Sequence, residues 1–265
     1  MNELKADVLS LQGKTVEKID LPDVFSEKFR PDLIQRTILA LQSHRRQPYG
    51  TDPLAGLRSS AHFHGRRRLR NTMQMRDIAR MSRIHEGPSN LYFRARKVPQ
   101  AVKGRRAHPP KVDKNWYQKI NEKERKLALR SAIAATVNKE IVNKRGHIVD
   151  LVELPIVVED AVQSIKKTKD VENLLSSLKL DRELERIKIK KIRAGRGKMR
   201  SRKYRIKKGP LIIVSEDKGI GKACKNIPGI DVRNVKTISV EDLAPGVNPG
   251  RLTIWSKSSI EKLSG

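Results

Sequence analysis

The chain of 265 residues contains a single cysteine, Cys224. One thiol excludes an internal disulfide and cysteine-rich zinc ribbons, and it is typical of a reducing compartment. The longest apolar runs, 154–158 and 210–214, are far too short to cross a bilayer, so we expect no membrane partner. The opening sequence MNELKADVLSLQGK has neither the basic nor the apolar region of a signal peptide, and we therefore expect a cytoplasmic protein.

Acidic residues are scarce beside basic ones: 29 Asp and Glu face 58 Lys and Arg, which gives a net charge of +29. Such an excess favours polyanionic partners. The excess is concentrated in two stretches. Residues 44–111 hold fourteen Arg and three Lys against three acidic residues, and residues 186–208 hold thirteen basic residues and no acidic one. The charge distribution predicts a nearly neutral body with two basic attachments.

The first basic stretch, residues 44–111, is called the arm below. It has no lasting helical or strand period, and Gly and Pro interrupt it throughout. A segment of this length without regular structure is usually functional or disordered. Arginine forms paired hydrogen bonds with phosphate and stacks on bases. We therefore expect an arm that is disordered in the free protein and orders within folded nucleic acid, with a maximum reach of about 100 Å when doubled back.

The rest of the chain, residues 1–43 and 112–265, has the pattern of a globular α/β body. We expect a hairpin that turns at 12–14, and helices over 31–43, 121–145, 171–180, 181–189 and 256–263, with Asn121 and Asp181 as caps. Buried strands are predicted at 154–158, 211–214, 232–235 and 252–255. Short apolar strands that alternate with helices predict three layers, with a mainly parallel sheet flanked by helices.

Motifs of enzymatic chemistry are weak. The turn at 219–223 has the sequence GIGKA, but a nucleotide-binding P-loop needs a further upstream glycine and a hydroxyl residue where Glu216 and Ala223 stand. A strand-to-helix turn is the favoured interpretation. Cys224 has no positioned histidine and is interpreted as a core residue. Without a catalytic triad or a carboxylate pair, we expect no enzyme activity and no cofactor.

The histidines His62, His64 and His85 are weak candidates for a metal site. No carboxylate or thiolate partner stands at ligand spacing, and nearby Arg side chains repel cations. RNA stacking or packing is favoured, and no metal is predicted. The arm aromatics Tyr49, Phe63, Tyr92 and Phe93 are expected to stack on unpaired bases, and the alternative is that they pack on one another.

Three strings resemble a known family: RARKVPQAVKGRRAHPPK at 94–111, NEKERKLALRSAIAAT at 121–136 and GRGKMRSRKYRIKKGPLIIVSED at 195–217. In this order they resemble the universal fourth protein of the large ribosomal subunit, in its archaeal and eukaryotic form. The resemblance implies a structural protein of the large subunit that binds rRNA and aids its assembly. It also implies a body on the subunit surface and an internal loop, here the arm, that threads rRNA to the wall of the peptide exit tunnel. The middle of the arm matches less well, and its sequence allows a short helix over 75–84.

The implied partners are large-subunit rRNA, neighbouring large-subunit proteins and, near the loop tip, the nascent peptide. The predicted rRNA-binding residues are basic or aromatic and lie in the two basic stretches: Arg45, Arg46, Tyr49, Arg58, Phe63, Arg66, Arg67, Arg68, Arg70, Arg76, Arg80, Arg94, Arg96, Lys97, Lys103, Arg105, Arg106, Lys111, Arg193, Arg196, Lys198, Arg200, Arg202, Lys203, Tyr204 and Arg205.

Two other functions stay open from the sequence. A nucleic-acid-processing enzyme should gather acidic or cofactor-binding residues at strand ends, whereas the acidic residues here are scattered. A DNA-compacting protein would share the charge but rarely needs one long arm broken by Gly and Pro. Irregular RNA suits such an arm better.

Overall fold

The computed structural model describes residues 4–68, 72–74 and 76–264. It divides into two compact units: the body, Met1–His44 with Gln118–Gly265, and a second unit, Arg45–Tyr117. In the described part, no helix combines the length and apolarity that a bilayer crossing requires.

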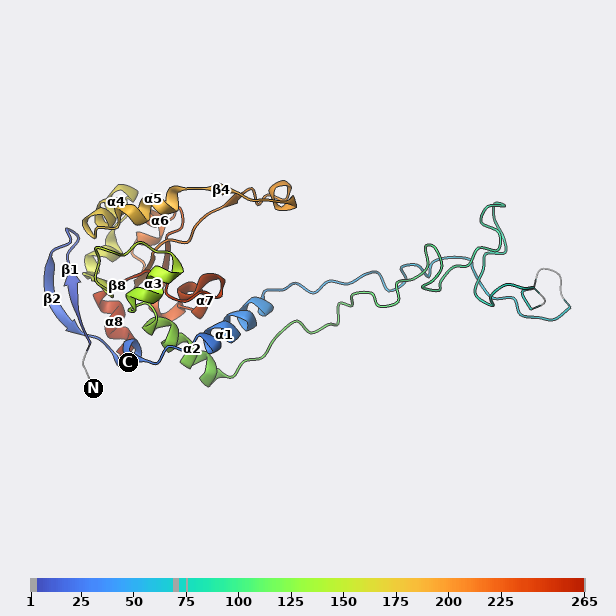
Figure 1. Ribbon diagram of the computed structural model, residues 1–265, viewed down its shortest axis with the longest axis horizontal. Coiled ribbons are helices and arrows are strands. Elements are labelled where there is room, and N and C mark those ends of the chain that lie inside the picture. The colour runs from blue at the N-terminus through green and yellow to red at the C-terminus, as the bar shows by residue number, and fades with distance from the viewer. Residues whose placement is uncertain (1–3, 69–71, 75, 265) are drawn as a thin grey trace. The chain divides into compact units, whose positions relative to one another are not determined.

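Within the described residues, the regular elements all belong to the body (Figure 1). Its α-helices are α1 Pro31–His44, α2 Glu122–Ala134, α3 Lys139–Arg145, α4 Thr168–Ser177, α5 Asp181–Lys188, α6 Ile220–Cys224, α7 Val240–Leu243 and α8 Lys257–Ser264. Its strands are β1 Lys5–Leu9, β2 Thr15–Asp20, β3 Ile156–Val158, β4 Lys191–Ile192, β5 Tyr204–Arg205, β6 Leu211–Val214, β7 Asp231–Asn234 and β8 Thr253–Ser256. Short 3-10 turns are η1 Asp23–Ser26, η2 Asp160–Ser164, η3 Arg196–Met199, η4 Val235–Thr237 and η5 Pro245–Val247.

Six strands form one mixed sheet in the order β2-β1-β3-β8-β6-β7. β1 and β2 pair antiparallel as the predicted hairpin, and every other neighbouring pair is parallel. Parallel neighbours require crossover connections, and helices in these crossovers cover both faces of the sheet. The predicted mainly parallel α/β architecture is confirmed.

Two hydrophobic cores lie on opposite faces of this sheet, because successive strand residues point to opposite sides. In β3, Ile156 and Val158 belong to the core beneath α4, α5 and α6, whereas Val157 belongs to the core shared with α1, α2, α7 and α8. Ile254 and Trp255 of β8 divide in the same way. The two groups of helices flank the sheet as the outer layers (Figure 1).

The single helix predicted over 121–145 is wrong, because the chain forms α2 and α3 with a break at 135–138. The Thr136 hydroxyl donates to the Ile133 carbonyl at 2.7 Å, and Asn138 starts the new helix. Its Oδ1 accepts the backbone N–H of Glu140 at 2.9 Å. An Asn that bonds its own downstream backbone favours a helix start over a helix interior.

The cap position predicted for α2 is confirmed, whereas the one predicted for α5 is wrong. Asn121 stands at the cap position of α2 but makes no capping bond through its side chain. Asp181 lies inside the first turn of α5, whose cap position is Leu180, and accepts a hydrogen bond from the Ser176 hydroxyl at 2.6 Å instead.

The ends of the body between which the second unit is inserted are tied together. Ser43 and His44 close α1, and Gln118 is the first body residue after the insertion. The Gln118 N–H donates to the Ser43 hydroxyl at 3.0 Å, and the Gln118 carbonyl accepts from His44 Nε2 at 2.9 Å. The body therefore closes on itself at this junction.

The second unit has no helix or strand among its described residues, and its pairing consists of two isolated bridges. Arg83 pairs antiparallel with His62 on one side and with Ala95 on the other. Its buried apolar side chains, in the part that the structure describes, are Ala61, Met73 and Ile84. The helix considered over 75–84 is wrong for the described residues 76–84, which form bends and irregular backbone with one bridge residue, Arg83, while Met75 lies outside them.

Candidate nucleic-acid interface

The second basic stretch, residues 186–208, is called the basic segment. Its sequence forms a hairpin: β4 and β5 pair antiparallel, with Lys191 opposite Arg205. At its tip the Gly197 carbonyl accepts the backbone N–H groups of Arg200 and Arg202 at 3.2 and 3.1 Å. The helix predicted over 181–189 is observed as α5, which ends at Lys188, so its last residues are the first residues of the basic segment.

From Lys188 onward, the side chains of the basic segment face solvent. All residues from Lys188 to Lys208 are exposed except the half-buried Gly197. Met199 is 81% and Tyr204 50% exposed, so the hairpin also presents apolar and aromatic surface. Within 188–208, the described part of the chain shows one ion pair, between Lys208 and Asp231 at 2.9 Å. So much positive charge without internal compensation favours a polyanion as the partner.

A buried polar cluster fixes the first end of the basic segment. Glu183 is fully buried and accepts from His147 Nδ1 at 2.7 Å, from the Ile148 N–H at 3.2 Å and from Arg186 Nε at 2.7 Å. Arg186 also donates to the Lys208 carbonyl at 2.7 Å, so it joins the two ends of the hairpin.

Protonation in this cluster follows from burial and hydrogen bonding. Burial raises the pKa of Glu183, but the hydrogen bonds from Arg186 and His147 outweigh it and the pKa is lowered. Burial lowers the pKa of His147 despite its contact with Glu183. The carboxylate is thus ionised and the imidazole neutral at neutral pH.

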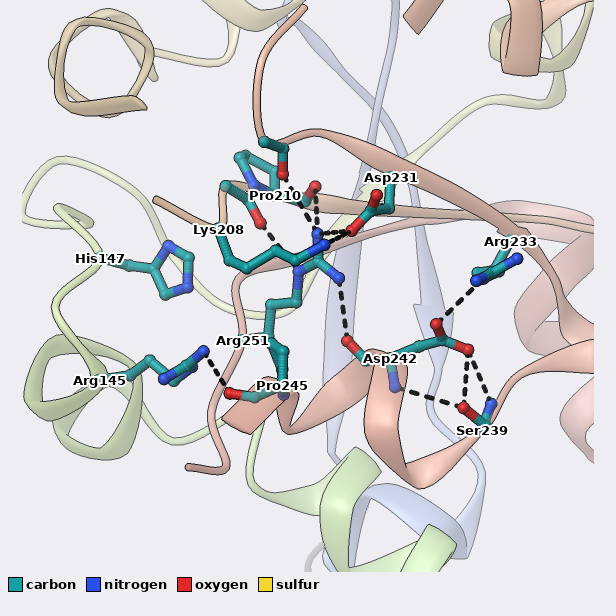
Figure 2. Close-up of polar contacts among 12 residues, drawn as sticks. Arg145, His147, Lys208, Pro210, Asp231, Arg233, Ser239, Asp242, Pro245 and Arg251 are labelled. Atoms are coloured by element: carbon teal, nitrogen blue, oxygen red, sulfur yellow. Dashed lines mark hydrogen bonds and ion pairs between the residues drawn. The ribbon is translucent and has the colours of Figure 1, made fainter. Parts of the chain in front are cut away.

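Arg251 fixes the other end of the basic segment (Figure 2). Its side chain is 1% exposed and donates to the carbonyls of Gly209 at 2.9 Å and Asp242 at 3.0 Å. Its Nη2 also forms an ion pair with Asp231 at 2.6 Å. Burial lowers the pKa of Arg251, and the Asp231 carboxylate opposes this effect. One guanidinium therefore links the end of the hairpin to β7 and α7.

Two stretches of the second unit lie close along each other, at 50–56 and 105–112. The Thr51 N–H donates to the Pro110 carbonyl at 3.1 Å. A Cβ on Gly56, whose φ is +78°, would lie 2.6 Å from the Arg105 Cα. Only glycine adopts this backbone without strain and permits so close an approach.

Most predicted binding residues of the arm are exposed. These are Arg45, Arg46, Tyr49, Arg58, Phe63, Arg66, Arg67, Arg68, Arg76, Arg80, Arg94, Lys103, Arg105, Arg106 and Lys111. Arg96 and Lys97 are half-buried, and Arg96 donates to the Val102 carbonyl. Arg70 lies outside the described residues. Arg83, which the charge pattern did not single out, donates to the carbonyls of Phe93 and Ala79 at 2.9 and 3.0 Å.

The arm aromatics are partly engaged with one another. Tyr92 and Phe93 meet edge to face with centroids 4.4 Å apart, and Tyr49 stacks on Trp116 at 5.7 Å. The Arg76 guanidinium lies 4.2 Å above the Phe93 ring. Tyr49 is nevertheless 60% and Phe63 47% exposed. Base stacking by these exposed faces stays a prediction.

Three histidines of the second unit gather although the sequence separates them. Candidate ligand atoms of His62, His64 and His85 all lie within 4.8 Å of one another. Desolvation, followed by repulsion from His85 and His62, lowers the pKa of His64. The sequence alone disfavours a metal site at these three histidines, because sequence spacing does not show that the pairing of His62 with Arg83 brings His85 beside the other two.

The structure gives Cys224 and the turn at 219–223 structural roles. Cys224 is buried, and burial raises the pKa of its thiol to about 12, with a smaller contribution from Asp217. At 219–223, Asp217 Oδ1 accepts the N–H groups of Gly219 and Gly221 at 2.9 and 3.1 Å. A carboxylate occupies the place where a P-loop would hold phosphate, and the turn leads from β6 into α6.

Comparison with known proteins places the chain clearly. Residues 19–265 match the model of the ribosomal protein L4/L1 family. Large ribosomal subunit protein uL4 of Archaeoglobus fulgidus is 50% identical over 261 residues, covering 98% of each chain. The uL4 protein of Nanoarchaeum equitans is 48% identical over 263 residues, covering 98% of this chain and 97% of the relative. That of Methanocaldococcus jannaschii is 46% identical over 261 residues, covering 98% of each.

Proposed function

The chain belongs to the ribosomal protein L4/L1 family, and from this premise we propose that its arm and its basic segment bind large-subunit rRNA. The protein is a structural constituent of the large ribosomal subunit and not an enzyme. A nucleic-acid-processing enzyme or a DNA-compacting protein is not supported.

One observation carries the rRNA proposal: the basic segment exposes its cationic side chains on a hairpin whose two ends are fixed. The root of the hairpin is the place where its two ends join the body. Arg186 and Arg251 fix this root by donating hydrogen bonds to the carbonyls of Lys208 and Gly209. The charges beyond this root are neither buried nor, apart from Lys208, paired with acids among the described residues. A fixed hairpin presents them to phosphates with little ordering cost.

The arm combines exposed Arg residues, exposed aromatic faces and two backbone stretches that approach each other closely at glycine. Guanidinium groups suit phosphates, aromatic faces suit unpaired bases, and thin backbone suits passage between RNA helices. Residues 44–111 therefore act as the rRNA-binding loop, and residues 1–43 and 112–265 as the body. The protein works in cytoplasmic ribosomes beside neighbouring large-subunit proteins and aids rRNA assembly.

The distal part of the arm, residues 62–86, borders the peptide exit tunnel and the nascent chain. The experiment deletes these residues and joins the flanks with a short Gly-Ser bridge. We expect a folded body and incorporation into large subunits, with altered chemical-probing reactivity of rRNA at the tunnel constriction. A matched control substitutes Gln for the flanking residues Arg105 and Arg106, which should weaken rRNA binding without removing the distal part.

Each outcome decides one part of the proposal. Unchanged reactivity of the tunnel wall in subunits that carry the deletion would refute the tunnel assignment. Failure of the purified full chain to bind large-subunit rRNA more tightly than duplex DNA would refute the rRNA-binding role of the two basic stretches.

A further inference from the structure

We propose that His62, His64 and His85 bind one divalent transition-metal ion of the zinc class, through three imidazole nitrogens and one water or phosphate oxygen. This site is independent of the rRNA-binding role.

Backbone pairing brings the three rings together. His62 and Arg83 exchange two backbone hydrogen bonds, at 3.1 and 3.0 Å. His64 and His85 are each two positions further along their segments, and alternate residues of extended chain share a face. The His62 and His64 ring centroids are 4.2 Å apart, and those of His62 and His85 are 4.6 Å apart. The cluster thus spans two segments that are distant in the sequence.

Hydrogen bonds to carbonyls leave a ring nitrogen free on two of the histidines. The Ser60 carbonyl, which can only accept, lies 2.9 Å from His62 Nδ1, so Nδ1 carries the proton and Nε2 the lone pair. The His62 carbonyl lies 3.1 Å from His85 Nε2, so the His85 lone pair is on Nδ1. That Nδ1 is buried and has no hydrogen-bond partner among the described residues. Metal-binding histidines characteristically donate their other N–H to a carbonyl in this way.

His64 completes the set. Its Nε2 is hydrogen-bonded to His62 Nε2, so a proton now lies between the two nitrogens. A metal takes the place of this proton when His64 moves its own proton to Nδ1. Zn–N distances of about 2.0–2.1 Å put tetrahedral ligands about 3.3 Å apart, so the rings must shift by a short distance. The ring of His64 now stacks on His85 at 4.0 Å and must turn, which its exposed position permits.

The donor set and its surroundings select the ion. Three imidazoles suit zinc, nickel or copper and not the oxygen-seeking calcium or magnesium. The exposed side chains of Arg66, Arg67 and Arg68 lie shortly after His64 in the sequence and repel a cation. Salt screens this repulsion, so binding should strengthen as salt increases. Adventitious binding to carboxylates shows the opposite salt dependence.

The experiment titrates the RNA-free full chain with Co²⁺ and Zn²⁺. We expect one equivalent of Co²⁺ to give the intense visible absorption of tetrahedral coordination and Zn²⁺ to displace it. Single substitutions His62→Ala, His64→Ala and His85→Ala should each weaken binding at least about tenfold, and the triple variant should lose the band. His108→Ala, in the same unit, should bind as the unchanged chain does. Raising salt from about 10 to about 150 mM should tighten binding.

A second measurement separates loss of ligands from loss of structure. Zn²⁺ should slow tryptic cleavage between Arg66 and Arg83 in the unchanged chain and in His108→Ala, but not in the triple variant. The proposal is overturned if the unchanged chain shows no tetrahedral Co²⁺ band, if the triple variant binds equally well, or if added salt weakens binding.

Discussion

Nη2 of Arg251 lies 2.6 Å from Oδ2 of Asp231, and through this contact the end of the basic segment is joined to the edge of the sheet (Figure 2). The Arg251 guanidinium is buried, whereas the Asp231 side chain is 37% exposed. The pair is therefore asymmetric: the carboxylate can be solvated without its partner, but the carbonyls around the guanidinium cannot.

The first prediction concerns this arginine. Arg251→Met should lower the free energy of unfolding by about 3 kcal/mol, because buried carbonyls lose their donor and Asp231 loses its buried partner. Urea unfolding followed by circular dichroism measures the loss. Arg233→Gln, which breaks the ion pair of this exposed arginine with the half-buried Asp242, should cost about 1 kcal/mol or less. Equal losses in the two variants would contradict a special role for Arg251.

The second prediction is a pH dependence due to His147. Its pKa is lowered in the folded state by burial, so the unfolded chain binds more protons near and below the unfolded value of about 6.5. Its contribution to stability is therefore complete above that pH and is lost as the pH falls below it. Glu183 adds a further loss below about pH 4.3, because its folded pKa is also lowered.

His147→Gln tests this assignment. The variant should show a flatter dependence of unfolding free energy between about pH 7 and about pH 5.5, with His108→Ala as the control for a solvent-exposed histidine. Urea unfolding across this range provides the measurement. A slope in His147→Gln identical to that of the unchanged chain would assign the dependence to other groups.

The third prediction concerns Cys224. Burial raises its thiol pKa to about 12, so almost no thiolate exists at pH 8 and reagent has no access. Modification by an aromatic disulfide reagent should be slow in the native protein and fast in denaturant. Rapid stoichiometric reaction of the native chain would show that the core beneath α6 opens readily.

The fourth prediction concerns the charge of the basic segment. Substituting Gln for Arg196, Arg200, Arg202 and Arg205 should weaken rRNA binding and flatten its salt dependence, by somewhat under one unit of slope for each phosphate that is no longer neutralised. The matched control replaces four exposed lysines of the nearly neutral N-terminal stretch, Lys5, Lys14, Lys18 and Lys28. The prediction fails if the two quadruple variants bind rRNA with the same salt slope.

The fifth prediction concerns proteolysis of the free protein. Trypsin should cut the exposed arm between Arg45 and Arg106, and the basic segment, before it cuts the helices of the body. Two isolated bridges and few buried side chains give the second unit little resistance to local opening. Fragments separated on denaturing gels and by size exclusion would show whether the body stays associated. Resistance of the arm equal to that of the body would contradict the expected disorder.

The architecture of the body could be predicted because its strands are short apolar runs. Such strands are buried on both sides, which requires a sheet covered by helices on both faces. Leu211–Val214 forms β6 at the predicted residues. The break between α2 and α3 was not predicted, because it depends on one local interaction. The Asn138 side chain accepts hydrogen bonds from the backbone N–H groups of Glu140 and Ile141, which starts a new helix instead of continuing α2. Propensity over 121–145 contains no such information.

The candidate interface was predictable in composition but not in geometry. Charge counts located the basic segment. Its two fixed ends, however, depend on the contacts of Glu183 with His147 and of Arg251 with Asp231, and no sequence pattern indicates either pair. The three histidines were judged weak candidates for a metal site for the same reason. Contacts between distant segments depend on register, and His85 meets His62 only because Arg83 pairs beside it.

The two edge strands of the sheet have a consequence for the protein before it meets RNA. β2 and β7 end the strand order, and their free backbone groups would accept a strand from another molecule. β2 carries Glu17, Lys18 and Asp20, and β7 carries Asp231 and Arg233. Another chain adding there would have to desolvate these charges. These edge charges therefore oppose aggregation of free copies by strand addition before the protein joins an assembling subunit.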